Sequence, residues 1–451
     1  MDNENPNYQE AMYAYSAAMT ACKDKMPEVQ KKIITLFVRI NQLKIQAENA
    51  EKFANEEKEK ADNARDLAEE EKLRAEEEKL NAEVERLNAM KEKMRADSIL
   101  KIANKILVQL YFYGDKFALA VKKNKDNNKN IYGFIDKQGN TVIDFVYEEA
   151  YPFDENTGFA KVKGKEDFFL KDTSGRTYLL CEEIDNLDFR AQALDLHFKK
   201  LKEIPKKVFK NGQLKILLLS SNLVEKIPVN ISLLAYNLFY LDLSNNRITS
   251  FPSEIGSLKN LTKLDLTNNK LTAIPPEIGN LKNLNSLRLG TNNLNSLPLE
   301  IGDLTNLKVL DLYYNMITDV PVDIGNLSNL TVLNLSYNKL NAVPAEIGNL
   351  HNLMILDLTY NKLTSMPSEI GNLNKLMVLD LSYNMLTSVP AELDDINSLR
   401  VLDLSYNKLN SLPSEIANLK NLERLYLYGN DFTNAEKQNI QLWLPNCEIF
   451  W

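Results

Sequence analysis

Leucines over the second half of the chain follow one repeating pattern, LxxLxLxxNxL. One copy consists of Leu353, Leu356, Leu358, Asn361 and Leu363. Regular copies lie 23 residues apart (269 − 246, for example), and nine of them keep an asparagine at the ninth position: Asn246, Asn269, Asn292, Asn315, Asn338, Asn361, Asn384, Asn407 and Asn430. Self-similarity at this period predicts a solenoid, whose units bury their apolar faces only by stacking on their neighbours.

This pattern closely resembles the leucine-rich repeat. Two less regular copies precede the nine: Asn222 holds the ninth position of the nearer copy, and Lys199 that of the farther one. About eleven repeats are therefore expected over residues 183–433. We expect the leucines of positions 1, 4, 6 and 11 to point inward, and a short strand at positions 3–5 to stack on the next repeat about 4.8 Å away. The expected fold is an α/β horseshoe with a parallel sheet on its concave face.

The ladder asparagines are predicted to be structural. An amide both donates and accepts hydrogen bonds, so it satisfies backbone groups that the turn inside the coil would leave buried and unpaired. Prolines recur after the asparagines at the same period, for example Pro344 and Pro367. Because proline cannot extend a ladder, we expect each to direct the chain to the convex side, where segments such as SEIGNL form short helical turns.

Both ends of the array need closure, because terminal repeats would otherwise expose their apolar core. At the amino end, Leu187, Phe189 and Phe198 are expected to add apolar bulk. At the carboxyl end, residues 434–451 are expected to form a cap that packs Ile440, Trp443, Leu444, Ile449 and Trp451.

Residues 111–182 contain short aromatic and β-branched runs broken by Gly and Asp/Asn turns, which predict strands and hairpins. The stretches YGFIDKQG at 132–139, PF at 152–153 and GFAKV at 158–162 resemble a bacterial WG-type β repeat. Tyr132 stands where that repeat usually has tryptophan. Residues 168–175 resemble a degenerate second copy without the glycine after its aromatic residue. The resemblance implies a small, mostly β module that binds and does not catalyse.

The first 110 residues are predicted to be α-helical. Within residues 1–45, Val29, Ile33, Phe37 and Ile40 recur at the spacing of an amphipathic helix. Residues 46–110 begin with a stretch rich in Glu, Lys and Ala without Gly or Pro, which is typical of a long exposed helix. Its heptad register changes along the segment. Two interpretations therefore stay open: a coiled-coil homodimer through residues 46–97, or a single solvated helix stabilised by ion pairs.

Composition and charge narrow the class of protein. The 451 residues suffice for about two to four domains. A net charge of −8 argues against nucleic acid as a partner, because phosphate binding needs a basic surface. Cys22, Cys181 and Cys447 are far apart and odd in number, which fits a reducing compartment. With no signal-like leader or membrane-spanning apolar run, we expect a cytoplasmic protein; secretion without a cleaved signal is the alternative.

Positions 3, 5, 7 and 8 of each repeat are expected to face the hollow and to form columns across the sheet. Position 3 is aliphatic, position 5 is an interrupted acidic row and position 8 is a tyrosine ladder; such mixtures are typical of interface centres. Asp357, Asp380 and Asp403 are the foremost candidates to contact a basic segment of a protein partner. The candidate binding residues are Asp311, Tyr314, Val332, Asn334, Tyr337, Ile355, Asp357, Tyr360, Val378, Asp380, Tyr383, Val401, Asp403 and Tyr406. A purely structural role of these residue types in the repeat is the alternative.

Catalysis finds little support in the sequence. The histidines, His197 and His351, lie in different repeats, and no GxxxxGK[ST] phosphate loop is present. Carboxylates on an open sheet lack the burial that separates the pKa values of an acid and a base. We therefore predict no enzyme activity, cofactor or metal. The predicted function is a protein-binding scaffold or adaptor, with a signalling role implied by the resemblance. A bacterial effector with an unrecognised enzymatic N-terminal module and a structural spacer are the alternatives.

Overall fold

The computed structural model describes residues 111–113, 117–124, 127–136, 138–154 and 157–451. The chain divides into two compact units, with the boundary between Thr177 and Tyr178. The helices predicted for residues 1–110, including the coiled coil at 46–97, lie outside the described residues. In the described ranges, no helix combines the length and the apolar character needed to cross a bilayer.

The first unit is built from antiparallel strands. One sheet contains β1 (Tyr111–Tyr113), β2 (Phe117–Lys123), β3 (Asn130–Ile135) and β4 (Thr141–Tyr147) in that order. A second antiparallel group contains β5 (Glu149–Ala150), β6 (Phe159–Lys163) and β7 (Phe168–Asp172). One apolar cluster joins both groups: Leu119, Phe134, Ile143, Phe153, Ala160 and Val162. The predicted small, mostly β module is confirmed.

One tight turn occurs twice in this unit. The Asp136 carboxylate accepts two backbone N–H groups of its own turn at 2.9 and 2.8 Å, and Asp172 accepts two at 2.9 Å each. Gly139 and Gly175 hold the third position after each aspartate with φ of 85° and 82°, a conformation that favours glycine. Residues 168–175 therefore repeat the end of strand β3 and the turn from Asp136 to Gly139.

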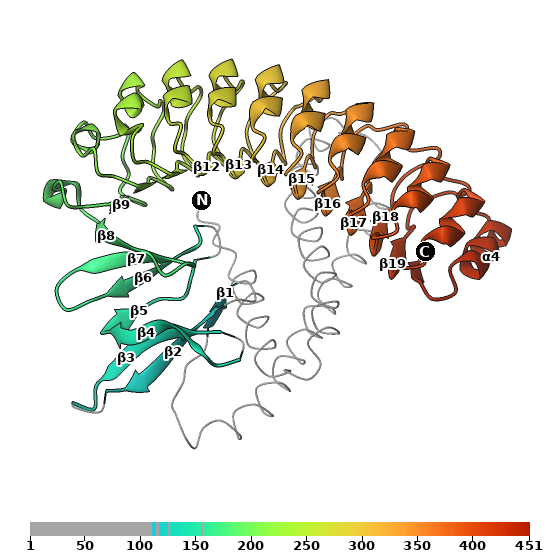
Figure 1. Ribbon diagram of the computed structural model, residues 1–451. Coiled ribbons are helices and arrows are strands. Elements are labelled where there is room, and N and C mark those ends of the chain that lie inside the picture. The colour runs from blue at the N-terminus through green and yellow to red at the C-terminus, as the bar shows by residue number, and fades with distance from the viewer. Residues whose placement is uncertain (1–110, 114–116, 125–126, 137, 155–156) are drawn as a thin grey trace, which may run out of the picture. The chain divides into compact units, whose positions relative to one another are not determined.

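The second unit is a coil of short parallel strands. Neighbouring strands pair without a shift between repeats, so that Leu356 aligns with Leu379. In Figure 1 these strands line the inner side of the arc formed by the repeats. The strands are β8 (Thr177–Cys181), β9 (Ala193–Asp195), β10 (Ile216–Leu218), β11 (Tyr240–Asp242), β12 (Lys263–Asp265), β13 (Ser286–Arg288), β14 (Val309–Asp311), β15 (Val332–Asn334), β16 (Ile355–Asp357), β17 (Val378–Asp380), β18 (Val401–Asp403) and β19 (Arg424–Tyr426).

Short 3₁₀ helices form the outer side of the same arc (Figure 1). From η5 onward each follows a proline, whose fixed φ near −70° starts the turn. In η9, for example, the Ile347 N–H donates to Pro344 O at 3.1 Å. The helices are η2 (Ile184–Asn186), η3 (Val208–Lys210), η4 (Val229–Leu234), η5 (Ser253–Ser257), η6 (Pro276–Asn280), η7 (Leu299–Asp303), η8 (Val322–Asn326), η9 (Ala345–Asn349), η10 (Ser368–Asn372), η11 (Ala391–Asp395) and η12 (Ser414–Asn418).

Between the strands and the 3₁₀ helices lies a continuous apolar core. The residues at positions 1, 4, 6 and 11 of the nine regular repeats are all buried. The asparagine ladder runs beside them: Asn361 Nδ2 donates to the carbonyl oxygens of Leu335 at 3.0 Å and Leu358 at 3.1 Å, and Asn361 Oδ1 accepts from Leu340 N at 3.0 Å. Equivalent bonds form from Asn222 to Asn430. The leucine core of the predicted solenoid is confirmed, and the asparagine side chains lie in series beside it.

A second asparagine series ties the outer loops together, and the pattern search did not single it out. Asn329 Nδ2 donates to Thr305 O at 2.8 Å, and Asn352 Nδ2 to Ser328 O at 2.8 Å. These bonds are exposed, unlike those of the inner ladder. Asn260, Asn283, Asn306 and Asn421 make the same bond to a carbonyl 24 residues earlier.

A glycine column allows adjacent 3₁₀ helices to pack closely. A Cβ on Gly325 would lie 2.6 Å from Glu346 O, which is too close for any real contact. The same conflict would arise at Gly256, Gly279, Gly302, Gly348 and Gly371. Glycine at this position therefore sets how closely the outer sides of neighbouring repeats approach.

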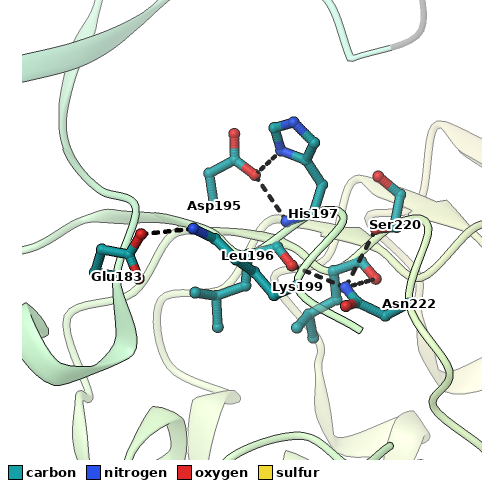
Figure 2. A network of polar contacts seen from close by, with 8 residues as sticks. Glu183, Asp195, Leu196, His197, Lys199, Ser220 and Asn222 are labelled. Carbon is teal, nitrogen blue, oxygen red and sulfur yellow. Dashed lines mark hydrogen bonds and ion pairs between the residues drawn. The ribbon is translucent and has the colours of Figure 1, made fainter. Parts of the chain in front are cut away.

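The amino end of the ladder is shown in Figure 2. Asn222 Nδ2 donates to Leu196 O at 2.8 Å and begins the inner series. Lys199, one repeat earlier, points away from the core and forms an ion pair with Glu183 at 2.6 Å (Figure 2). A charged amine cannot replace a buried amide, because it cannot accept a hydrogen bond. The inner ladder therefore starts at Asn222.

One expectation for the amino end is wrong. Leu187 is buried, as expected, but Phe189 and Phe198 are 77% and 64% exposed. Phe198 occupies position 8 of the first repeat and has a φ of 56°, the left-handed backbone conformation that this position keeps as far as Tyr406. Its side chain therefore lies on the surface and not in a cap.

The carboxyl end is closed by α4 (Asn434–Trp443) and β20 (Glu448–Phe450). Thr433 caps α4 by accepting the Glu436 N–H at 3.2 Å, and β20 pairs in parallel with β19. Ile440 and Leu444 are buried, and the predicted remainder of the cap packs against the same core: Trp443, Ile449 and Trp451. α4 and β20 therefore cover the apolar core at this end.

Candidate functional site

The five tyrosines at position 8 follow strands β14 to β18 and stack on one another. Ring centroids are 4.3 Å apart for Tyr337 and Tyr360, 4.0 Å for Tyr360 and Tyr383, and 4.3 Å for Tyr383 and Tyr406. Their planes differ by at most 17°. Tyr314 extends the series more loosely, with its centroid 6.1 Å from that of Tyr337. We call these five residues the tyrosine ladder.

Every member of the tyrosine ladder has a left-handed backbone conformation, with φ between 52° and 54°. This conformation costs roughly 1–2 kcal/mol for most residues, and asparagine tolerates it better. Asn245 and Asn268 hold the same position in earlier repeats, both with φ of 54°. Stacking of aromatic pairs offsets the cost by about 0.5–1.5 kcal/mol each. The backbone would therefore accept asparagine at position 8 of every repeat that has tyrosine there.

The ladder ends at Gly429, which holds position 8 in the last repeat. A Cβ on Gly429 would lie 2.5 Å from a ring carbon of Tyr406, so the last ring occupies the space that a side chain would need. Burial raises the pKa of both Tyr360 and Tyr383 well above the usual value, and the neighbouring tyrosines add to this effect. Their hydroxyl groups therefore stay protonated at physiological pH.

The acidic residues at position 5 cap the turns that follow their strands. Oδ1 of Asp357 accepts the Thr359 N–H at 3.0 Å, and Oδ1 of Asp380 accepts the Ser382 N–H at 3.0 Å. The same bond occurs at Asp242, Asp265, Asp311, Asn334 and Asp403. Residue spacing alone did not reveal this role. It explains why neutral asparagine replaces aspartate at one rung without loss of the turn.

The second oxygen of these carboxylates can receive a cation. At Asp265, Oδ2 lies 3.6 Å from an Arg288 guanidinium nitrogen on the next strand. Burial raises the pKa of Asp311 to about 6, although the Tyr313 N–H and Arg288 oppose the shift. Burial and the neighbouring Asp380 raise the pKa of Asp357 to about 7. A cation placed beside either carboxylate would favour its charged form and lower its pKa.

The aliphatic column at position 3 is accessible only in part. Val309 and Val332 are half-buried, and Ile355 is 37% exposed beside Met354, which is 41% exposed. Toward the carboxyl end the predicted residues are buried, with 3–4% of their surface exposed: Val378, Asp380, Val401 and Asp403.

The prediction of an open acidic row through Asp380 and Asp403 is therefore corrected. Asp380 Oδ1 accepts the Ser382 hydroxyl at 2.7 Å as well as its N–H, so this carboxylate is satisfied inside the fold. The accessible acids are Asp311 and Asp357, which are half-buried with neutral Asn334 between them. We call the concave side of β14–β16 the open face.

Neither histidine contributes to this surface. His197 pairs with the Asp195 carboxylate at the amino end (Figure 2), and His351 lies exposed on an outer loop. Over the described ranges, no cluster of three or more His, Cys, Asp or Glu side chains could hold a metal ion. The open face offers apolar contact, carboxylate oxygens and phenol hydroxyls, which are groups suited to non-covalent recognition.

Family models match both units of the chain. Models described as leucine-rich repeat region, leucine rich repeat and leucine rich repeats (2 copies) match residues 230–333, 305–363, 351–409 and 397–437. A model described as WG containing repeat matches residues 132–165. The chain is a leucine-rich repeat protein with a WG repeat region. The asparagine ladder and the open face thus belong to its leucine-rich repeats, and the turn at Asp136 to its WG repeat.

Solved structures resemble this leucine-rich repeat protein over its repeat array. A leucine-rich repeat protein of Leptospira interrogans is 29% identical over 60% of this chain and 99% of its own, with a TM-score of 0.33. A TDR receptor is 31% identical over 59% of this chain and 48% of its own, with a TM-score of 0.54. This chain therefore spans about half of that receptor. A search of curated proteins finds no match.

Proposed function

We propose that this leucine-rich repeat protein is a non-enzymatic scaffold that binds a protein or peptide through the concave side of β14–β18. The tyrosine ladder carries the proposal. Five tyrosines occupy left-handed positions at which asparagine serves the fold at lower backbone cost. Tyrosine supplies a large amphipathic contact area, which asparagine does not, and it is enriched at interface centres.

The carboxylates beside the tyrosine ladder favour a partner with a basic segment. Asp265 already binds a guanidinium within the chain through the oxygen that the turn does not use. Asp311 and Asp357 likewise accept the turn N–H through Oδ1, and their own strands, β14 and β16, carry no basic residue. The similarity to a protein named as a receptor adds support for a binding role.

The proposed role includes a cytoplasmic site of action in intracellular signalling. Cys181 and Cys447 are free thiols, as suits a reducing compartment, and burial raises the pKa of Cys447 to about 12. A dimer through residues 46–97 would present two concave faces to one partner assembly.

Affinity capture from cells expressing the full chain tests the binding face. The test variant is Tyr360→Asn/Tyr383→Asn, because Asn245 and Asn268 show that asparagine fits the same backbone position. The control is Tyr236→Asn, which makes the same change at a tyrosine that is 88% exposed and outside the ladder. We expect the double variant to lose partners that the wild type and the control retain. Recovery of the same partners by all three proteins would contradict the proposal.

A further inference from the structure

Strand addition cannot be the binding mode on the open face. β15 is paired in parallel with β14 on one side and β16 on the other, and β14 and β16 are likewise paired on both sides. Their backbone N–H and C=O groups are therefore committed to the ladder. A partner can meet this face only through side chains.

The repeat distance of the face matches an α-helix better than an extended chain. Neighbouring strands lie about 4.8 Å apart, whereas one helical turn advances about 5.4 Å. Side chains on one side of an extended strand are separated by about 6.6–6.8 Å. Across the two intervals from β14 to β16, the mismatch is about 1 Å for a helix and about 4 Å for a strand.

The open face presents an apolar column beside a polar column, and an amphipathic helix likewise presents an apolar row beside a polar row. Val309, Val332 and Ile355 form an apolar column, and Asp311, Asn334 and Asp357 form a polar column two residues further along the same strands. The two acids are separated by two strand intervals, or about 9.6 Å. Residues i and i+7 of a helix are about 10.5 Å apart.

Both ends of this surface are marked by a change of chemistry. On the β13 side, Arg288 lies opposite Asp311 in the acidic column and would repel a basic side chain placed beyond Asp311. On the β17 side, Val378 and Asp380 are buried. The part of the concave surface where a basic helix can bind is therefore limited to β14, β15 and β16.

Taking the proposed function as its premise, we infer that the partner element is an amphipathic α-helix lying across the strands. It carries cationic residues at i and i+7 over Asp311 and Asp357, and a polar residue at i+3 or i+4 over Asn334. The row of helix side chains next to these cationic residues is apolar and packs on Val309, Val332, Ile355 and Met354. The inferred partner is thus a basic amphipathic helix of another protein.

Fluorescence anisotropy with labelled synthetic peptides tests this inference on the full chain. The probe is an α-helical peptide of about 15 residues, roughly 22 Å long, with Lys at i and i+7 and a leucine row beside them. A second peptide has the same composition with one central position changed to Pro, which breaks the helix. We expect the helical peptide to bind at least tenfold more tightly than the proline peptide.

Protein variants locate the site of peptide binding. Asp311→Asn/Asp357→Asn copies the neutral rung at Asn334, so the turns are kept, and it should weaken binding at least tenfold. Asp323→Asn in η8 removes one charge from the outer side and should leave binding unchanged. Asp311→Lys/Asp357→Lys should instead bind a peptide with Glu at i and i+7.

The possible outcomes separate this inference from its premise. Equal binding of the helical and proline peptides, or no effect of Asp311→Asn/Asp357→Asn, would overturn the helix inference. If the tyrosine variant still loses its cellular partners in that case, the scaffold proposal stands. If the tyrosine variant retains all partners as well, both proposals fail.

Discussion

Replacement of Asn361 by alanine tests how much the asparagine ladder stabilises the repeats. Asn361 is 8% exposed and joins two repeats through one side chain. Its amide nitrogen donates to Leu335 O and Leu358 O at 3.0 and 3.1 Å, and its oxygen accepts from Leu340 N at 3.0 Å. Alanine removes these three bonds and a longer fourth one, to Thr359 O at 3.3 Å, and leaves the backbone groups buried in the core.

The expected loss follows from these contacts. Each hydrogen bond contributes about 1 kcal/mol net, so three bonds predict a loss of about 3 kcal/mol in the free energy of unfolding. Partial relaxation or entry of water would reduce this toward about 1 kcal/mol. Asn361→Asp should cost more at neutral pH, because a carboxylate still accepts from Leu340 N but faces two carbonyl oxygens.

Urea denaturation followed by circular dichroism measures the effect on the full chain. Asn329→Ala is the matched control, because Asn329 has the same period but makes one exposed bond, to Thr305 O at 2.8 Å. We expect its cost to stay below about 1 kcal/mol. If Asn361→Ala and Asn329→Ala unfold at the same midpoint, the ladder asparagines do not stabilise the fold by hydrogen bonding to buried backbone groups.

Three further changes probe the glycine column, the acidic column and the tyrosine ladder. Gly325→Ala should lower the unfolding midpoint, because its Cβ would meet Glu346 O at 2.6 Å, and urea denaturation measures this. Asp357 binds a proton more tightly in the folded state, with its pKa raised to about 7, so the free energy of unfolding falls as pH rises from about 4 to about 7. Asp357→Asn should remove this fall and be more stable than the wild type at pH 8, as urea titrations at each pH show. Tyr360→Asn should stay within about 1 kcal/mol of the wild type, whereas Tyr360→Val should lose more in the same assay, because a β-branched residue resists a φ of 52°.

Each of these predictions has its own control and contrary result. Gly212→Ala is the control for Gly325→Ala, since a Cβ on Gly212 meets nothing within 4 Å; equal midpoints would contradict the packing argument. Asp323→Asn controls for loss of a charge, and an unchanged pH profile of Asp357→Asn would show that Asp357 titrates normally. Equal stability of the asparagine and valine variants at Tyr360 would mean that the left-handed backbone imposes no cost.

Much of the repeat unit could be predicted from residue spacing. Ile355 to Asp357 form β16 at positions 3–5, as predicted, and the ladder bonds of Asn361 have the expected donors and acceptors. This succeeds because stacking forces each repeat to place the same residue type in the same environment. Phe198 was misassigned for the converse reason. It lies in an irregular repeat, and its apolar character suggested a cap although its side chain is exposed.

The candidate face was predictable only in outline. The columns at positions 3, 5 and 8 follow from the period, but the bond between Asp357 Oδ1 and Thr359 N depends on how the chain turns after the strand. The stacking of Tyr360 on Tyr383 at 4.0 Å depends on side-chain directions set by the left-handed backbone. The burial of Asp380, and hence the limit of the open face, depends on neighbours that spacing does not describe.

The sequence by itself determined the coil of leucine-rich repeats, its inner asparagine ladder and its C-terminal cap, because a strict period leaves one way to bury the leucines. Tertiary structure alone decided which surface side chains are available for binding. Residue type fixes which chemical groups a side chain carries, whereas the hydration, pKa and accessibility of those groups depend on the atoms packed around them. Asp357 and Asp380 share one position of the repeat, yet one is half-buried on the open face and the other is enclosed.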